Sequence, residues 1–268
     1  MYQLKTGKYR SLFVSDLHLG TRGSQADLFL DFLRRVDAET IYLVGDIVDF
    51  WRLRSRLFGK WRSEHRDVVR RLVERARSGA RVVFIPGNHD ADARRYVGRT
   101  IAGVEVMRDA IHVGADGRRY LVTHGDEFDV VNERATWLAH MGDYGYALAL
   151  FGNTYLAAAR RWLGLRYWSF SNWVKHKVKE AVNFIGAYED ALVAAARARG
   201  ADAVICGHIH HPAMRDIDGI GYLNIGDFVE SCTALVEHHD GRMELLHWGG
   251  APEAVAATEE PELAAQAA

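Results

Sequence analysis

The sequence predicts a layered α/β domain with a largely parallel sheet. Three observations support this: short apolar runs rich in β-branched residues, amphipathic helical patterns between the early runs, and a polar cluster at the end of each run. The chain has 268 residues, of which 49% are hydrophobic and 26% are charged. This composition suits one large domain, or one domain with an insertion.

Five runs are expected to be strands buried on both faces, because each is continuously apolar rather than alternating. They are Ser11–Ser15, Thr40–Val44, Arg81–Ile85, Tyr120–Thr123 and Ala203–Cys206. Helices are expected at Ala26–Val36 and His65–Ser78, where apolar residues recur at spacings of three and four.

Shorter strands are expected after His210, at Gly221–Ile225, Thr233–Glu237 and Met243–His247. We expect these three strands to complete a second sheet. Two Asp-Gly pairs, Asp116-Gly117 and Asp240-Gly241, predict hairpin turns, because such pairs readily adopt positive φ angles.

The region from about 127 to 200 is helical in pattern and rich in aromatic residues, with basic residues between them. We interpret it as a helical insertion in a single domain spanning 1–250, because the strand pattern resumes after it. Its segment Arg160–Trp168 mixes cations with aromatics, as interfacial helices do, although these aromatics could instead pack inward. The remaining residues, 251–268, are expected to form a disordered tail.

Composition excludes some classes of function. The net charge is −1, and no basic stripe with stacking aromatics stands apart from the insertion, so no nucleic-acid partner is expected. No protein partner is evident. Two cysteines, no apolar leader segment and no long apolar run favour a cytoplasmic protein.

Polar residues follow each of the five predicted strands. They are Asp16 and His18; Asp46 and Asp49; Asn88, His89 and Asp90; His124; and His208 and His210. Taken singly, each has an ordinary reading as a turn, a helix cap or a satisfied polar group. Together they predict one ligand site, because the carboxyl ends of strands meet at one edge of a sheet.

Metal binding is the favoured chemistry for this site. Converging carboxylates and imidazoles need a counter-charge, and oxygen and nitrogen ligands suit Mn²⁺, Fe or Mg²⁺, with Zn²⁺ possible. Seven of these residues are plausible ligands. That is too many for one tetrahedral ion and suits two ions that share a carboxylate. Such pairs of ions act on phosphoryl groups.

The ordered motifs DLH, GDxxD, GNHD, HGD and GHIH, from about Leu12 to Asp227, resemble the calcineurin-like metallophosphoesterase superfamily. The resemblance implies a four-layer α-β-β-α sandwich with a helical lid insertion, and two divalent ions that activate a water for in-line attack on phosphorus. It implies that Asp16, His18 and His210 hold one ion, that Asn88, His124 and His208 hold the other, and that Asp46 bridges them.

Catalytic roles are also implied for the third motif. His89 would contact the phosphoryl oxygens or protonate the leaving group, and Asp90 would orient His89. Asp49 would either support the ligands or cap the following helix. A non-catalytic scaffold with this fold is disfavoured because every expected ligand is present.

Within the superfamily, GDIVDFW, HGDEFD, GHIHHPA and the insertion resemble the UDP-2,3-diacylglucosamine pyrophosphohydrolase family of lipid A synthesis. This implies a manganese-dependent enzyme, cytoplasmic and peripheral on the inner membrane, that releases UMP and a lipid monophosphate. Substrate contacts would come from Asn88, His89, Lys175, Lys179 and His208. The best-known members carry arginine where this chain has His89, so another phospholipid, a nucleotide or a soluble phosphate ester is the alternative substrate.

Overall fold

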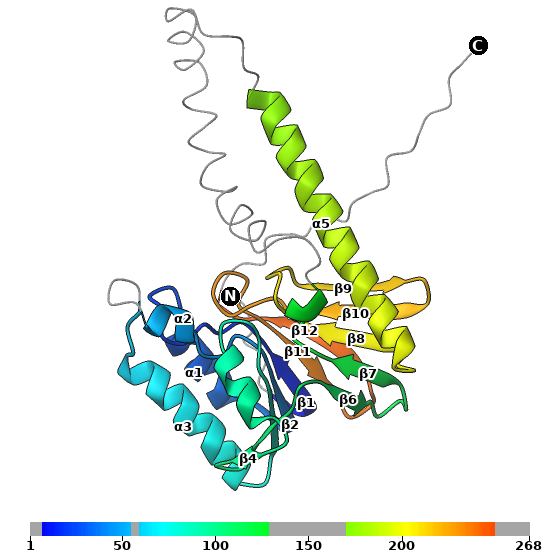
Figure 1. Cartoon of the computed structure of the whole chain (residues 1–268). Helices are drawn as coiled ribbons and strands as arrows, with labels where there is room; N and C mark the ends of the chain where they lie inside the picture. Colours follow the sequence, from blue (N-terminus) through cyan, green and yellow to red (C-terminus); the bar gives the residue numbers. More distant parts are fainter. Residues whose placement is uncertain (1–6, 55–58, 129–169, 250–268) are drawn as a thin grey trace, which may run out of the picture.

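The computed structural model describes residues 7–54, 59–128 and 170–249. Two sheets lie at its centre (Figure 1). The first has the strand order β12-β11-β1-β2-β3-β5-β4 and the second has the order β6-β7-β8-β10-β9. The strands of the first sheet are β1 (Gly7–Val14), β2 (Val36–Val44), β3 (Arg81–Ile85), β4 (Thr100–Ile101), β5 (Val104–Val106), β11 (Thr233–Glu237) and β12 (Met243–His247). Those of the second are β6 (Ala110–Val113), β7 (Arg119–Val122), β8 (Ala203–Cys206), β9 (Ala213–Ile217) and β10 (Ile220–Asn224).

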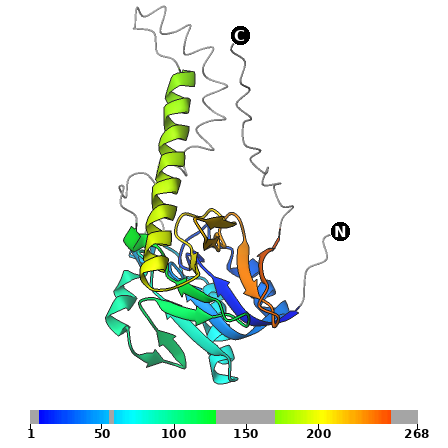
Figure 2. The same cartoon turned by 90° about the vertical axis from the view of Figure 1, so that its right-hand side faces the viewer.

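Helices cover the outer faces of both sheets. The α-helices are α1 (Ala26–Arg35), α2 (Phe50–Leu53), α3 (Ser63–Arg77) and α5 (Phe170–Ala198), and two 3₁₀ turns are η1 (Ala91–Tyr96) and η2 (Asp126–Phe128). Helices α1 and α3 pack on the first sheet, and the C-terminal part of α5 packs on the second (Figures 1 and 2). The expected four-layer α-β-β-α sandwich is therefore confirmed.

Alternation along the central strands builds two of the three cores. In β1, Leu12 and Val14 face the helices, whereas Phe13 faces the second sheet and stacks on Tyr42 at a ring distance of 4.8 Å. Because both faces are buried, the strand reads as a continuous apolar run. All five expected strands are present, with boundaries that differ by a few residues at some ends.

Both expected helices differ at their ends. The second is Ser63–Arg77 rather than His65–Ser78, and the first was expected to include Val36, but this residue begins β2. Its backbone is extended, with φ −111° and ψ 127°, and it pairs with Gly7 of β1. The β-branched Val36 ends the helix by entering the sheet, so no loop separates the two elements.

The grouping of the late strands also differs from expectation. Only β10 joins the second sheet, whereas β11 and β12 extend the first, with Leu12 of β1 opposite Val236 of β11 in an antiparallel pair. The physical reason is the second edge of β1, whose buried backbone groups need partners that β11 supplies. Both expected hairpins are confirmed, with Gly117 at φ 82° and Gly241 at φ 87°.

The expected insertion contains one long described helix, α5. Its C-terminal part belongs to the sandwich, because Tyr188, Leu192 and Ala196 pack on the second sheet. Its N-terminal half extends beyond both sheets (Figures 1 and 2) and carries Lys175 and Lys179, whose side chains are outside the described part. Residues 129–169, with Arg160–Trp168, and the expected tail 251–268 also lie outside it. No described helix combines the length and apolarity needed to cross a bilayer.

Candidate metal centre

The five strand ends with polar residues meet at one place, contributed by both sheets. Strands β1, β2 and β3 run parallel in the first sheet, and β7 and β8 run parallel in the second. Backbone hydrogen bonds join neighbouring loops: the amide of Asp16 donates to Gly45 O at 3.1 Å, and that of Gly207 donates to His124 O at 3.1 Å. The expected convergence therefore occurs across two sheets rather than at the edge of one.

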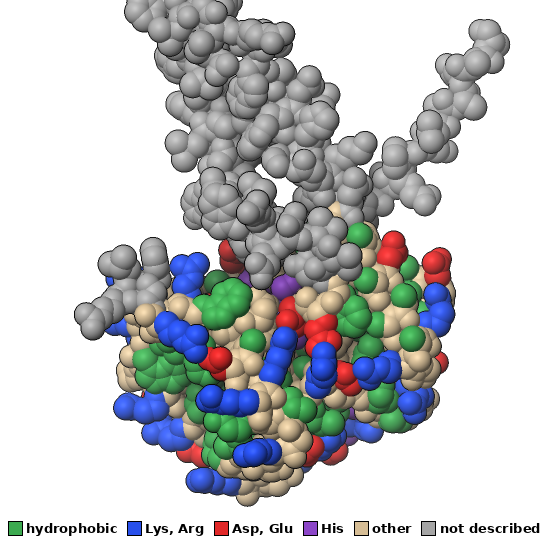
Figure 3. Space-filling view, viewed as in Figure 1, with side chains coloured by type: hydrophobic (Ala, Val, Ile, Leu, Met, Phe, Trp, Pro, Cys, Tyr) green, Lys and Arg blue, Asp and Glu red, His purple; other side chains and the backbone are tan. Residues whose placement is uncertain are grey.

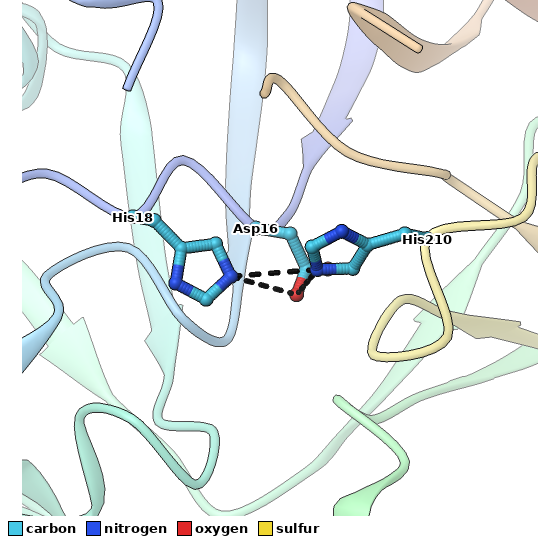
Figure 4. Close-up of side chains that lie close together, drawn as sticks. All are labelled: Asp16, His18 and His210. Carbon is cyan, nitrogen blue, oxygen red and sulfur yellow. Dashed lines mark hydrogen bonds and ion pairs between the residues drawn. The ribbon is translucent and has the colours of Figure 1, made fainter. Parts of the chain in front are cut away.

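The first cluster consists of Asp16, His18 and His210 (Figure 4). Asp16 Oδ1 lies 3.1 Å from His210 Nε2 and 3.7 Å from His18 Nε2, and the two Nε2 atoms are 3.4 Å apart. Three ligand atoms thus face a common point. The other oxygen of Asp16 accepts a hydrogen bond from the His208 amide, which fixes the carboxylate.

The second cluster consists of Asp46, His124 and His208. Asp46 Oδ2 lies 3.5 Å from His124 Nε2 and 3.9 Å from His18 Nε2, so this carboxylate stands between the clusters. Asn88 Oδ1 is 3.4 Å from His124 Nε2. His124 Nδ1 lies 3.1 Å from Val44 O, and this contact favours a proton on Nδ1 and leaves Nε2 as a metal ligand.

The charges of the site fit divalent cations. Burial alone would lower the pKa of His18 and of His124, but neighbouring carboxylates raise each to about 10. For His18 these are Asp16, Asp49 and Asp46, and for His124 they are Asp46, Asp16 and Asp126. Left to themselves, the carboxylates would therefore hold protons on imidazoles whose nitrogens lie close together. Cations would supply the positive charge and use the imidazole lone pairs instead. The oxygen and nitrogen donors suit Mn²⁺, Fe, Mg²⁺ or Zn²⁺.

His89 lies beside the clusters and is held on three sides. Its Nδ1 is 2.9 Å from Asp49 Oδ2, and its ring is 4.8 Å from the His18 ring and 4.5 Å from the Trp51 ring. With Nδ1 against a carboxylate, Nε2 is the nitrogen left for a substrate. His18, Asp46 and His89 also form a third group of neighbouring ligand atoms.

Asp49 serves both of the roles considered for it. One oxygen accepts from the Arg52 amide at 2.7 Å and caps α2, and the other lies 3.2 Å from His18 Nδ1 and beside His89. Burial would raise the pKa of Asp49, but the hydrogen bonds from His18, His89 and Arg52 outweigh it and lower the pKa. Asp49 therefore remains an anion that orients two imidazoles.

Asp90 does not take the orienting role expected for it. Its carboxylate accepts hydrogen bonds from the amides of Gly87, Ile47 and Val48 at 2.6, 2.8 and 3.3 Å, and so joins two ligand loops. The side chain turns inward because these amides would otherwise be buried without partners. Burial and the neighbouring Asp46 charge raise the pKa of Asp90 to about 6.

The ligand loops contain unusual backbone conformations. Five candidate ligands have positive φ angles: Asp16 at 52°, His18 at 44°, Asp46 at 53°, His208 at 70° and His210 at 52°. Residues other than glycine rarely adopt this region, which costs roughly 1–2 kcal/mol each. Such strain gathers at functional sites, where surrounding contacts enforce it.

Two supporting residues were missed by sequence reasoning. Trp51 covers one face of His89, and the only signal for it was its place in the GDIVDFW motif. Asp227 is buried and accepts from the Val229 amide at 2.7 Å in a turn whose Phe228 amide donates to Asp16 O. Gly226-Asp227 repeats the Gly-Asp pattern at a further strand end, which could have revealed it.

Comparisons with known proteins show the family of this chain. A family model described as calcineurin-like phosphoesterase matches residues 9–212. Curated relatives named UDP-2,3-diacylglucosamine hydrolase include one from Aliivibrio fischeri, 33% identical over 43% of this chain and 47% of its own, so this alignment spans less than half of either protein. Another from Azotobacter vinelandii is 28% identical over 77% and 84%, and one from Xanthomonas campestris is 27% identical over 86% and 96%. Among solved structures, the phosphoesterase Yfce from E. coli is similar, with a TM-score of 0.43 and 14% identity over 89% of this chain and 99% of its own.

Proposed function

We infer a specific reaction from the premise that this chain belongs to the calcineurin-like phosphoesterase family and is a metal-dependent phosphoester hydrolase. We propose that it hydrolyses the pyrophosphate of UDP-2,3-diacylglucosamine to UMP and a lipid monophosphate. The observation that carries the proposal is the pair of ligand clusters that meet at Asp46. The names of the curated relatives support this substrate over other phosphate esters.

The proposed metal ligands follow the two clusters. Asp16, His18 and His210 would hold one ion, Asn88, His124 and His208 the other, and Asp46 both. Two divalent ions there, proposed to be Mn²⁺, would lower the pKa of a water and neutralise phosphoryl charge. The protein residues fix the donors in place and, through hydrogen bonds to Asp49 and to Val44 O, select the ring nitrogen that each imidazole of His18 and His124 presents.

His89 is the proposed residue that contacts the phosphoryl oxygens or gives a proton to the leaving group. Asp49 holds its Nδ1, so Nε2 would carry the proton toward the substrate. Asp90 is then a positioning residue that fixes the backbone between the loops of Asp46 and His89. Trp51 limits rotation of the His89 ring from one side.

The remaining substrate contacts are proposed at the rim of the centre. Asn88 and His208 would contact phosphoryl oxygens, and Lys175 and Lys179 of α5 would meet phosphate or sugar oxygens. The projecting half of α5 supports a role as part of a lid over the acyl chains. The proposed setting is the cytoplasmic surface of the inner membrane, where such a lipid resides.

The test is hydrolysis of UDP-2,3-diacylglucosamine by the purified protein with Mn²⁺, beside bis(p-nitrophenyl) phosphate under the same conditions. Rapid release of UMP is the expected result. Turnover of the artificial diester alone would keep the metal centre and reject the substrate, and another phospholipid, nucleotide or soluble phosphate ester would replace it. The variant His89→Arg carries the residue of the best-known members of the family that this chain resembles. It therefore tests whether the residue at this position decides between UDP-2,3-diacylglucosamine and another substrate.

A further inference from the structure

Two tryptophans are strongly exposed, and one of them, Trp51, lies beside the metal centre. Trp51 is 52% exposed and Trp61 is 45% exposed, and among the described residues they are the only aromatic side chains in the set of strongly exposed large hydrophobic groups. The Trp51 ring also contacts His89, so the exposed surface begins at the proposed catalytic loop. Exposing these apolar rings to water is unfavourable, and exposed apolar surface of this kind often marks a binding surface.

Contacts of Gly59 hold the segment that carries Trp61 against α2, which carries Trp51. A Cβ on Gly59 would lie 2.2 Å from Arg52 O, so the chain there packs directly on the backbone of α2. Gly59 bridges to Thr21, and the Lys60 amide donates to Gly20 O at 2.9 Å. Lys60 and Trp61 are thereby fixed next to α2.

The same segment is strongly basic. Between Asp49 and Glu64 the sequence has five basic residues and no acidic one, although the whole chain has a net charge of −1. Arg52, Arg54 and Lys60 are exposed, and Figure 3 shows blue and green side chains gathered over the region of α2 and α3. Arg54 pairs with Asp92, but exposed ion pairs contribute little, so an anionic partner can compete for it.

Arg62, in contrast, turns inward, where its Nη2 donates to Ser24 O at 3.0 Å. The Trp51–Trp61 surface is therefore defined by Trp51, Arg52, Arg54, Lys60 and Trp61. It combines exposed cations with aromatic rings that are apolar in body and polar at one edge. Such rings favour the boundary between lipid and water, and cations favour anionic head groups.

We propose that the Trp51–Trp61 surface docks this protein on an anionic phospholipid bilayer, with the metal centre next to the contact. The proposal rests on the proposed function in one respect, since a diacyl substrate would be drawn from that bilayer. A nucleic acid fits less well. One face of Trp51 is covered by His89, and Trp61 meets His65 edge to face at 5.4 Å, so less ring surface remains for stacking bases.

The test is flotation of the full chain with vesicles of phosphatidylcholine alone and of phosphatidylcholine mixed with phosphatidylglycerol. We expect the protein to bind the mixed vesicles and to lose this binding in about 1 M salt, because the Debye length is then only roughly 3 Å. Each unit of charge near an anionic bilayer is worth roughly fivefold in partitioning. Lys60→Gln should therefore weaken binding about fivefold and Lys60→Glu about 25-fold, and Trp61→Ser should weaken it severalfold.

Matched controls lie near β4, away from α2 in Figure 1. Arg99→Glu repeats the charge reversal of Lys60→Glu, and Ile101→Ser removes an apolar side chain that is 46% exposed, close to the value for Trp61. Both controls should bind vesicles like the unmodified protein. All variants should hydrolyse bis(p-nitrophenyl) phosphate at the unmodified rate, because Lys60 and Trp61 lie outside the catalytic machinery.

Two results would overturn the proposal: failure of the unmodified protein to float with the mixed vesicles, or equal flotation of the Lys60 and Trp61 variants. Tighter binding to a single-stranded oligonucleotide than to vesicles would also reject it, in favour of nucleic acid. Flotation is measured without turnover. Loss of UDP-2,3-diacylglucosamine hydrolysis with intact flotation would thus reject the proposed substrate and leave the surface standing.

Discussion

At the scale of single residues, Asp49 has two structural roles between which the sequence alone could not decide. It caps α2 with one oxygen and holds the rings of His18 and His89 with the other. The GDxxD spacing places it at the right loop, but spacing cannot show which of Asp49 and Asp90 faces His89. The buried amides of Gly87, Ile47 and Val48 decide this, because they donate hydrogen bonds to Asp90. Asp49 is therefore the carboxylate that faces His89.

Asp49→Asn tests this role directly. The amide oxygen can still cap α2, but the charge that orients two imidazoles is lost, so we expect kcat on bis(p-nitrophenyl) phosphate to fall about 10–100-fold. The control is Asp92→Asn, which removes an exposed carboxylate from the neighbouring turn. An Asp49→Asn enzyme with kcat within twofold of the unmodified protein would assign Asp49 to helix capping alone.

Glycine at the ligand loops has a steric reason that a turn rule does not capture. A Cβ on Gly87 would lie 2.4 Å from Asp46 Oδ1 and 2.6 Å from His124 Nε2. Gly87→Ala should displace these two donors and reduce bound manganese severalfold, measured as metal per chain after dialysis. Gly79→Ala, where a Cβ meets nothing within 4 Å, controls for general loss of stability, although its φ of 104° adds some strain. Equal metal content in the two variants would contradict the steric argument.

At the scale of elements, continuous apolar runs were the strongest predictors. The predicted bounds of Arg81–Ile85 and Ala203–Cys206 match the structure to the residue. Central strands of this kind are recognised as continuous apolar runs that end where the polar residues begin. The edge strands β4 and β9 were not predicted, whereas the edge strand β12 was, at Met243–His247. In β9, for example, Ala213–Ile217 carries three exposed residues, and Arg215 separates Ala213 and Ile217, which pack on the core. The apolar pattern is therefore too weak to predict a strand, and the pairing with β10 defines it. Likewise, no local sequence pattern predicts that β11 pairs with β1.

Helix α5 shows how an inserted helix becomes part of the core. Leu192 is fully buried between α5 and the second sheet. Leu192→Ala should lower the free energy of unfolding by about 2–5 kcal/mol in urea titrations, since a cavity replaces the side chain. Asp190→Ala, on the exposed side of the same helix, should change it by about 0.5 kcal/mol or less. A small effect at Leu192 would mean that the second sheet is stable without its helical layer.

At the scale of the whole molecule, a buried polar network joins the two sheets. Glu237 of β11 accepts hydrogen bonds from Ser11 Oγ at 2.7 Å and from the Ala115 amide at 2.8 Å, and its Oε2 lies 2.8 Å from His112 Nε2 on β6. Burial alone would raise the pKa of Glu237, but the bonds from His112, Ser11 and Ala115 lower it to about 2. The carboxylate therefore stabilises the sandwich mainly while it is ionised.

The sign of the pH effect follows from the lowered pKa. The stabilisation is complete above the ordinary glutamate pKa of about 4.5 and is lost as the pH falls toward 2. Glu237→Gln should reduce the free energy of unfolding at neutral pH by roughly 3 kcal/mol and flatten its decline between about pH 4.5 and pH 2. Glu39→Gln, an exposed site on β2, should leave that decline unchanged. An unaltered acid slope in Glu237→Gln would place the titrating group elsewhere.

The candidate ligands are spread from Asp16 to His210, across most of the described chain and both sheets. Neither sheet alone has the complete set, so the centre can form only after the two sheets have docked. During synthesis, a nascent chain shorter than His210 would present incomplete clusters with weak hold on any ion. Metal capture is therefore a late step of biogenesis, reserved for chains that have already folded.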